Sequence, residues 1–241
     1  LELWNSEECA GAIEVDSDGA VVISARNYTD QQERVFGVTV PVVKRQSLLT
    51  SGRTGDLPWL AQGSSGSVSL STDLWLYLDN AAAEAEVEFF NEKGESLSVG
   101  TYGGGSQVVR IRVGDLVSGE VPLLRAEVRP KSGGVAAFAE LTSSSGDRLG
   151  SGLVDVAENE GTQVLSPAYR LRTSSGVALW SDVRLFNPRA VEITMRLTYR
   201  GDSKAVTMGP KEIREISDVL GTVFGVVDDS QDLLLLSLGQ G

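Results

Sequence analysis

Short runs in which apolar and polar residues alternate recur along the chain, and no stretch of a dozen residues has the 3.6-residue periodicity of a helix. Residues 85–89 place Ala85, Val87 and Phe89 on one face of a strand and two glutamates on the other. Residues 193–199 alternate in the same way, and turns rich in Gly, Asn and Asp separate the runs. Strands at this spacing are typical of an antiparallel sandwich or barrel. We therefore expect an all-β fold.

Part of the sequence occurs twice. The segment at 71–77 (STDLWLY) is matched 109 residues later by the segment at 180–186 (WSDVRLF). After each copy come an alternating run, a polar turn and a Val/Ile-x-Asp-Leu/Val motif, which lies at 113–116 in one copy and at 216–219 in the other. Because Asp and Ser cap helices, a single helical turn is expected at 113–116 and at 217–220.

The other half of the repeating unit lies on the N-terminal side. Residues 12–25 match residues 125–139 in their pattern of strand, turn and strand. The chain is therefore expected to consist of a second half-module at 1–45, a complete module at 46–157 and a first half-module at 158–241. One module is thus split between the two ends.

Two motifs of this unit resemble a repeat of secreted and cell-surface bacterial proteins. Trp180–Pro188 (WSDVRLFNP) is similar to the pattern R-T-D-L-x-L-x-N-P of that family, and Gly133–Ala139 (GGVAAFA) is similar to a later strand of it. The first copy departs from the pattern at Leu78–Asn80, where the family has Asn-Pro. The resemblance implies tandem immunoglobulin-like antiparallel β-sandwich modules in an extracellular or cell-surface setting, and it supplies no catalytic residues.

The amino-acid composition excludes several kinds of catalytic and metal site. Histidine is absent and Cys9 is the single cysteine, so Ser-His-Asp, Cys-His and Cys/His zinc arrangements cannot form. Glu84, Glu86 and Glu88 lie opposite apolar residues, which indicates a solvent face rather than a pair of catalytic carboxylates. We expect no enzymatic activity, no cofactor and no resident metal. A role for Cys9 and weak calcium binding by acidic loops such as 228–232 stay open.

The net charge and the hydropathy limit the classes of partner that we expect. The chain has 33 acidic and 21 basic residues, for a net charge of -12. Nucleic acids and anionic membranes select clusters of Lys and Arg, so neither is an expected partner. The longest apolar stretches, such as 233–236, are too short to cross a bilayer, so no membrane insertion is expected.

The C-terminal strand is the expected assembly element, because an apolar row at an open sheet edge seeks a partner strand. The row consists of Leu233, Leu234, Leu235, Leu236 and Leu238. The complementary half-module contributes Ile13, Val15, Val21 and Ile23. The two half-modules can close within one chain, can join neighbouring chains, or can belong to a longer array of which this chain is a fragment.

The expected function is that of an extracellular structural protein, a filament or surface-layer subunit that joins other copies head to tail by β-strand complementation. The alternative is a monomeric carbohydrate- or protein-binding β-sandwich module of a larger secreted protein. Its partner would be a surface glycan or another protein. Trp4, Trp59, Trp75 and Trp180 would form a sugar-binding platform if exposed, whereas Trp75 and Trp180 lie beside the repeated Asp and are expected to be packing residues of the sandwich.

Overall fold

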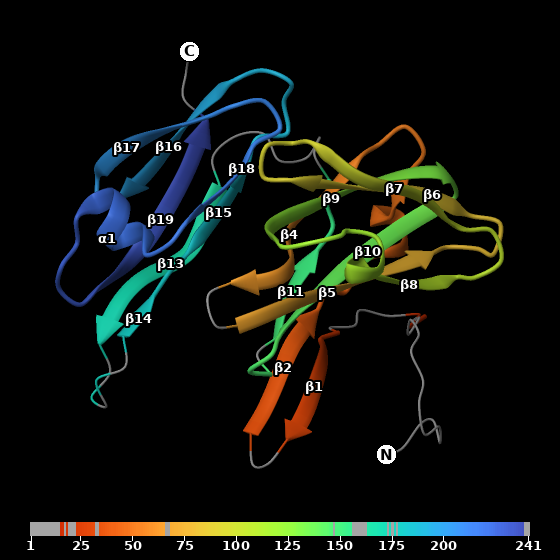
Figure 1. The fold of residues 1–241 in the computed structure, drawn as a ribbon, viewed down its shortest axis with the longest axis horizontal. Coiled ribbons are helices and arrows are strands. Elements are labelled where there is room, and N and C mark those ends of the chain that lie inside the picture. Colours follow the sequence, from red (N-terminus) through yellow and green to blue (C-terminus); the bar gives the residue numbers. More distant parts are fainter. Residues whose placement is uncertain are drawn as a thin grey trace.

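The computed structural model of the chain is all-β, with several antiparallel sheets and, in the part of the chain described, one short α-helix (Figure 1). It describes residues 15, 16, 18, 23–31, 34–65, 68–146, 148–155, 163–172, 174, 176 and 178–238. The all-β class expected from the alternation is confirmed. The first elements are β1 (Ala25–Gln31) and β2 (Arg34–Val40), which form an antiparallel hairpin with Ala25 opposite Val40.

The middle of the chain, which we call the central unit, folds over on itself around one apolar core. Its elements are η1 (Arg45–Ser47), β3 (Leu49–Thr50), β4 (Gly55–Ser65), β5 (Val68–Leu78), β6 (Glu84–Asn91), β7 (Ser96–Gly103), β8 (Val108–Arg112), η2 (Val113–Asp115), β9 (Val121–Ser132), β10 (Gly134–Ser143), β11 (Arg148–Gly152) and β12 (Val154–Asp155). The strand order is β11-β10-β5-β4-β9-β6-β7, and β8 pairs with β5. Leu76 and Ala137 from one end of this path share a core with Val87 and Ala126 from the other end.

The C-terminal unit has a second, separate core. Its elements are β13 (Gln163–Arg172), β14 (Ala178–Trp180), β15 (Val183–Phe186), β16 (Ile193–Tyr199), β17 (Asp202–Met208), β18 (Ile213–Ile216), α1 (Val219–Phe224) and β19 (Ser230–Leu238). The five-stranded sheet has the order β14-β13-β19-β16-β17, and β15 pairs with β18. Leu185, Leu197, Leu220 and Leu234 meet in this core.

Local sequence signals explain several element boundaries. The alternating run at 193–199 coincides with β16. The expected helical turns are present as η2 and α1, and the carboxylate of Asp218 caps α1 by accepting a hydrogen bond from the amide of Gly221. β2 ends at Val40, immediately before Pro41, because the nitrogen of a proline cannot donate a hydrogen bond to a sheet.

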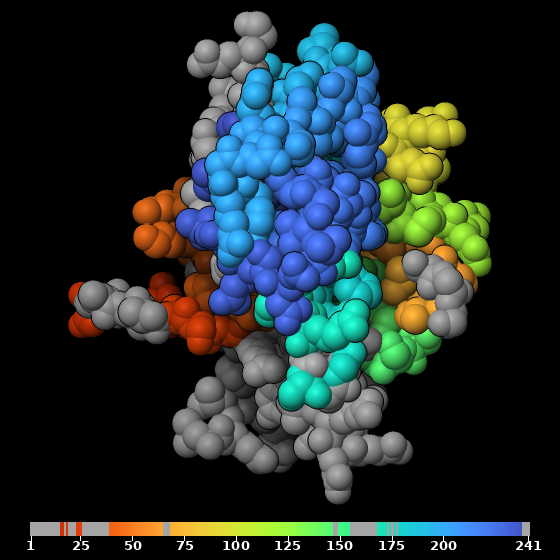
Figure 2. Space-filling view, turned by 90° about the vertical axis from the view of Figure 1, so that its left-hand side faces the viewer, coloured from red at the N-terminus to blue at the C-terminus, as the bar shows by residue number. Residues whose placement is uncertain are grey.

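Figure 1 shows the three parts in space. The C-terminal unit lies against one side of the central unit, which it largely covers in the view of Figure 2. The β1–β2 hairpin extends below β11 and β5, away from the β13–β19 sheet. Pro41, just after β2, lies beside Gly152 of β11. The described strands of this hairpin pair with each other and with no strand of either unit.

Candidate functional site

The two units share one strand order, and this equivalence locates the site. The C-terminal path β14-β13-β19-β16-β17 repeats the central path β5-β4-β9-β6-β7, and β15 pairs with β18 as β5 pairs with β8. The central unit has one continuous strand, β5, where the C-terminal unit has β14 followed by β15. The recurrence of 71–77 at 180–186 therefore corresponds to a recurrence in three dimensions.

Small details of the backbone recur as well. The pairing of β4 with β9 slips between Leu57 and Leu60, and the pairing of β13 with β19 slips between Leu165 and Ala168, at the same step of three residues. In the central unit the amide of Ala61 donates to the hydroxyl of Thr72 at 3.1 Å. In the C-terminal unit the amide of Tyr169 donates to the hydroxyl of Ser181 at 3.0 Å. A shared irregularity is stronger evidence of equivalence than a shared strand order, because regular pairing arises in any sheet.

The equivalence ends at one hairpin. In the central unit β10 pairs with β5 from Leu70 to Leu78, and β11 pairs with β10. Val135, Ala137 and Ala139 of β10 enter the core there. In the described part of the C-terminal unit no strand pairs with β14 or β15 in the place of β10. A sheet edge is therefore without a partner strand where the repeat would place one.

The residues on this edge are unusually exposed for their type. Leu179 and Trp180 of β14 are 43% and 49% exposed. Next to them is an open groove of about 700 Å³, lined by side chains that include Arg170, Asp218 and Val227. Arg170 donates to the carboxylate of Asp218 at 2.8 Å and to the carbonyl of Val227 at 2.9 Å, so its charge is neutralised within the unit. The candidate site is thus the outer edge of β14 and β15 together with this groove.

The leucine row that the sequence analysis assigned to assembly occupies another position. β19 lies inside the sheet, between β13 and β16, and is hydrogen-bonded to both. Leu234 is fully buried, Leu235 and Leu236 are partly buried, and Leu233 is 52% exposed. Leu238 lies opposite Met195 of β16. The strand therefore finds its partners in its own chain and presents no open edge.

The complementary half-module is described only in part. Ile13 and Val21 lie outside the described residues. Val15 is 51% exposed and Ile23, two residues before β1, is 38% exposed. Ile23 therefore leads into a hairpin whose described strands pair with no strand of either unit.

A buried arginine joins the two units. The side chain of Arg125 is 1% exposed and binds Asp56 at 2.6 Å and Glu127 at 3.4 Å. Its guanidinium is stacked between the ring of Phe90, 3.9 Å away, and the ring of Phe186 on β15, 4.5 Å away. Burial outweighs the attraction of Arg125 and raises the pKa of Asp56 to about 6. Arg125 thus contacts side chains of both units and helps to position them.

A second arginine makes a similar contact from the other side. The guanidinium of Arg184, whose side chain is 5% exposed, lies 4.4 Å from the ring centre of Trp59 and binds Glu215 at 2.7 Å. It also donates to the carbonyl of Leu60 at 3.0 Å and of Pro58 at 3.4 Å. Arg184 belongs to β15, so β15 is held against the central unit on one side while its outer edge stays without a strand.

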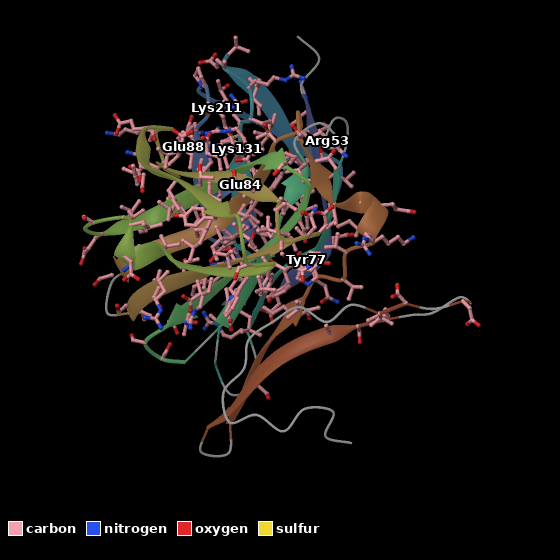
Figure 3. All side chains as sticks on the ribbon, turned by 90° about the vertical axis from the view of Figure 1, so that its right-hand side faces the viewer. Arg53, Tyr77, Glu84, Glu88, Lys131 and Lys211 are labelled. Atoms are coloured by element: carbon pink, nitrogen blue, oxygen red, sulfur yellow. The ribbon has the colours of Figure 1, made fainter. Side chains whose placement is uncertain are left out.

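Two of the three glutamates of β6, Glu86 and Glu88, are ion-paired. Arg129 of β9 binds Glu86 at 2.8 Å and also binds Glu88 and Glu127. Hydrogen bonds from Arg129 lower the pKa of Glu86. Figure 3 shows Lys211 at the end of the molecule that carries Glu88 and Lys131, and its ammonium lies 4.0 Å from Glu127. Glu127 links these charges to the buried Arg125.

Sequence reasoning did not identify Arg125 or Arg184 as junction residues. Each occupies the outward-facing position of an alternating strand, where a charged residue is expected to meet solvent. The single signal was the replacement of Trp75 by Arg184 at equivalent positions of the repeat. Among the described residues there is no group of three metal-ligating side chains and no helix that is long and apolar enough to cross a membrane.

Comparisons of the chain with protein-family models, with curated proteins and with solved structures find no match.

Proposed function

We propose that this chain is an extracellular structural protein built from tandem immunoglobulin-like β-sandwich modules, which assembles head to tail by β-strand complementation. In this assembly the N-terminal hairpin of one copy completes the C-terminal unit of the next. The contact joins two different surfaces of the molecule, so repeated addition gives a filament rather than a closed dimer. The resemblance of residues 180–188 to a repeat of bacterial cell-surface proteins supports the extracellular setting.

One observation carries the proposal. The C-terminal unit repeats the central unit but has no described counterpart of the β10–β11 hairpin, whereas the β1–β2 hairpin at the other end pairs with neither unit. The sequence that leads into this hairpin, residues 20–25, matches the sequence of β10. The described part of the chain therefore contains a sandwich without this hairpin and, separately, a hairpin that follows a matching sequence.

The energetic reasoning favours exchange of the hairpin over exchange of β19. Removing β19 from between β13 and β16 would break two ladders of backbone hydrogen bonds and expose Leu234. Docking the hairpin breaks no described pairing and covers the exposed 38% of Ile23 and 43% of Leu179. Complete burial of such a side chain is worth roughly 1.5–3 kcal/mol, so each contributes a part of that amount. Backbone hydrogen bonds along β15 add to this gain.

The groove beside Trp180 supports the second candidate, a carbohydrate- or protein-binding module. An exposed indole next to Arg170, Asp218 and Asp229 offers a stacking surface and polar groups, as sugar-binding sites do. The main proposal explains the exposure of Trp180 differently, because a docked hairpin would cover that edge.

Negative-stain electron microscopy and size-exclusion chromatography with light scattering test the proposal directly. We expect filaments and a mass that grows with protein concentration in multiples of 25.6 kDa. A variant without residues 1–44 retains the acceptor edge and lacks the hairpin, so adding it to the full chain should shorten the filaments. Monodisperse particles of 25.6 kDa at every concentration would contradict the proposal, and glycan binding by such particles would favour the second candidate.

A further inference from the structure

We infer that the acceptor surface is the outer edge of β14 and β15, and that its occupant is the β1 segment of a second copy in one defined register. In this register Ile23 lies opposite Leu185, Ala25 opposite Val183, Arg26 opposite Asp182 and Tyr28 opposite Trp180. The inference rests on the proposed function and adds to it the docking edge, the docked segment and the pairing of residues.

The first step is the acceptor side of the register. The shared hydroxyl bond equates Ser181 with Thr72, and the continuous chain from there equates Val183 with Leu74. In the central unit the strand that pairs with this position is β10, with Ala139 opposite Leu74 and Ala137 opposite Leu76. A donor strand should therefore run antiparallel to β15 and place its equivalents of Ala139 and Ala137 opposite Val183 and Leu185.

The second step is the donor side of the register, which a glycine sets. Gly133 precedes β10 with φ +70°, and a Cβ there would lie 2.6 Å from the side chains of Ala83 and Asp79. No residue other than glycine fits that turn without strain. In the sequence Gly19 stands two residues before Val21, as Gly133 stands two residues before Val135. Aligning the glycines equates Ile23 with Ala137 and Ala25 with Ala139.

The third step is the chemistry of the facing residues, which was not used to set the register. The buried positions Ala137 and Ala139 become Ile23 and Ala25, both apolar, opposite the core residues Leu185 and Val183. A larger Ile in the place of Ala137 suits a core to which no β10 contributes side chains in the single chain.

The outward-facing positions are complementary too. Residue 26 takes the place of Glu140, opposite the equivalent of Asp73, so Arg26 meets the exposed Asp182. Residue 28 takes the place of Thr142, opposite the equivalent of Ser71, so Tyr28 meets the exposed Trp180. An ion pair and an aromatic pair are both favourable as cross-strand neighbours. A shift of the register by one residue would place Arg26 opposite Val183 and turn Ile23 away from the core.

Disulfide trapping tests this register, because facing residues of paired strands lie close enough for a disulfide without movement of the backbone. The background is Cys9→Ser, which leaves no other cysteine. Chains that carry both Ala25→Cys and Val183→Cys are oxidised with copper-phenanthroline and run on a non-reducing gel. We expect a ladder of covalent oligomers that dithiothreitol abolishes, and a covalent dimer only when the two single variants are mixed.

The matched control is Ser24→Cys with Val183→Cys, which moves the donor cysteine by one residue to the opposite face of the strand. We expect at least a tenfold weaker ladder from it. Filaments in the microscope with equal ladders from the two pairs, or with none, would overturn the register and leave the proposed function intact. Monodisperse protein would overturn the proposed function itself. A fast-migrating oxidised monomer from the Ala25→Cys pair would show closure within one chain and overturn the inference.

Discussion

Phe90 of the central unit and Phe186 of the C-terminal unit both lie against one guanidinium, that of Arg125, with their ring centres 3.9 Å and 4.5 Å from its carbon. Arg184 makes the converse contact. It belongs to the C-terminal unit, and its guanidinium stacks on the ring of Trp59 in the central unit. These two contacts fix how the units are oriented. In a filament whose units are fixed in this way, each added copy takes the same orientation as the one before.

Replacing Arg125 by methionine should lower the free energy of unfolding by about 3–5 kcal/mol, because Asp56 would keep a buried charge without a partner. Urea denaturation at pH 7.5 measures the change. Arg200→Met is the control, since Arg200 is 56% exposed and its loss should cost less than about 1 kcal/mol. The double variant Arg125→Met/Asp56→Asn should recover part of the loss. If Arg125→Met and Arg200→Met lowered the free energy of unfolding by the same amount, the result would contradict a buried junction at Arg125.

Asp56 should make stability depend on pH. Its pKa is raised from 3.8 to about 6 in the folded protein, so the folded state binds the proton more tightly than the unfolded chain does. The resulting stabilisation is complete below about pH 3.8 and is lost as the pH rises through about 6. At 1.36 kcal/mol per pKa unit the full effect is ~3 kcal/mol. Asp56→Asn has no such group, so its free energy of unfolding minus that of the wild type should rise between pH 4 and 7.5.

Taking the difference between the wild type and Asp56→Asn cancels the contributions of the other carboxylates to the pH dependence. Arg129 lowers the pKa of Glu86, and the amide of Leu233 lowers that of Asp232. Groups of this kind stabilise the fold as the pH rises, but they do so equally in the wild type and in Asp56→Asn. If the difference in free energy of unfolding between Asp56→Asn and the wild type stayed constant from pH 4 to 7.5, the pKa of Asp56 would not be raised in the folded protein.

Arg184→Lys should destabilise the junction by about 1–2 kcal/mol. A lysine cannot bind Glu215 through two nitrogens, stack flat on Trp59 and reach the carbonyls of Pro58 and Leu60 together. The control is Arg110→Lys, because Arg110 also stacks on a tryptophan, Trp75, but is 43% exposed. Thermal unfolding should show a clear loss for the first variant and a change within about 0.5 kcal/mol for the second.

The sequence allowed much of the strand pattern to be predicted, because each strand carries its own period-two signal. The run at 85–89 becomes β6 with Ala85, Val87 and Phe89 fully buried, as the alternation requires. The match of 71–77 with 180–186 corresponds to equivalent strands and to the shared hydroxyl contacts of Thr72 and Ser181. Such features depend on residues near one another in the chain.

The partners of whole surfaces could not be predicted in this way. Arg125 follows the rule for an outward-facing position, and only the packing of the second unit buries it. The leucines of β19 read as an exposed edge, whereas pairing with both β13 and β16 makes β19 an inner strand. Periodicity tells which residues share a face, and it does not tell what covers that face.

Ile23→Lys tests the assembly with the smallest change to the single chain. Ile23 is 38% exposed, so a lysine there should leave the melting temperature within about 2 °C. In the docked hairpin the same lysine would enter the apolar core opposite Leu185, at a cost of several kcal/mol, and should block assembly. Ser24→Lys is the matched control, because residue 24 is exposed and takes the outward-facing position of the docked strand.

Sedimentation velocity of these three proteins over a hundredfold range of concentration is the most direct measurement. Exchange of the hairpin predicts that the wild type and Ser24→Lys form species that grow with concentration, while Ile23→Lys stays at 25.6 kDa throughout. Growth of Ile23→Lys to the same extent as the wild type, or a wild type that never exceeds 25.6 kDa, would contradict it.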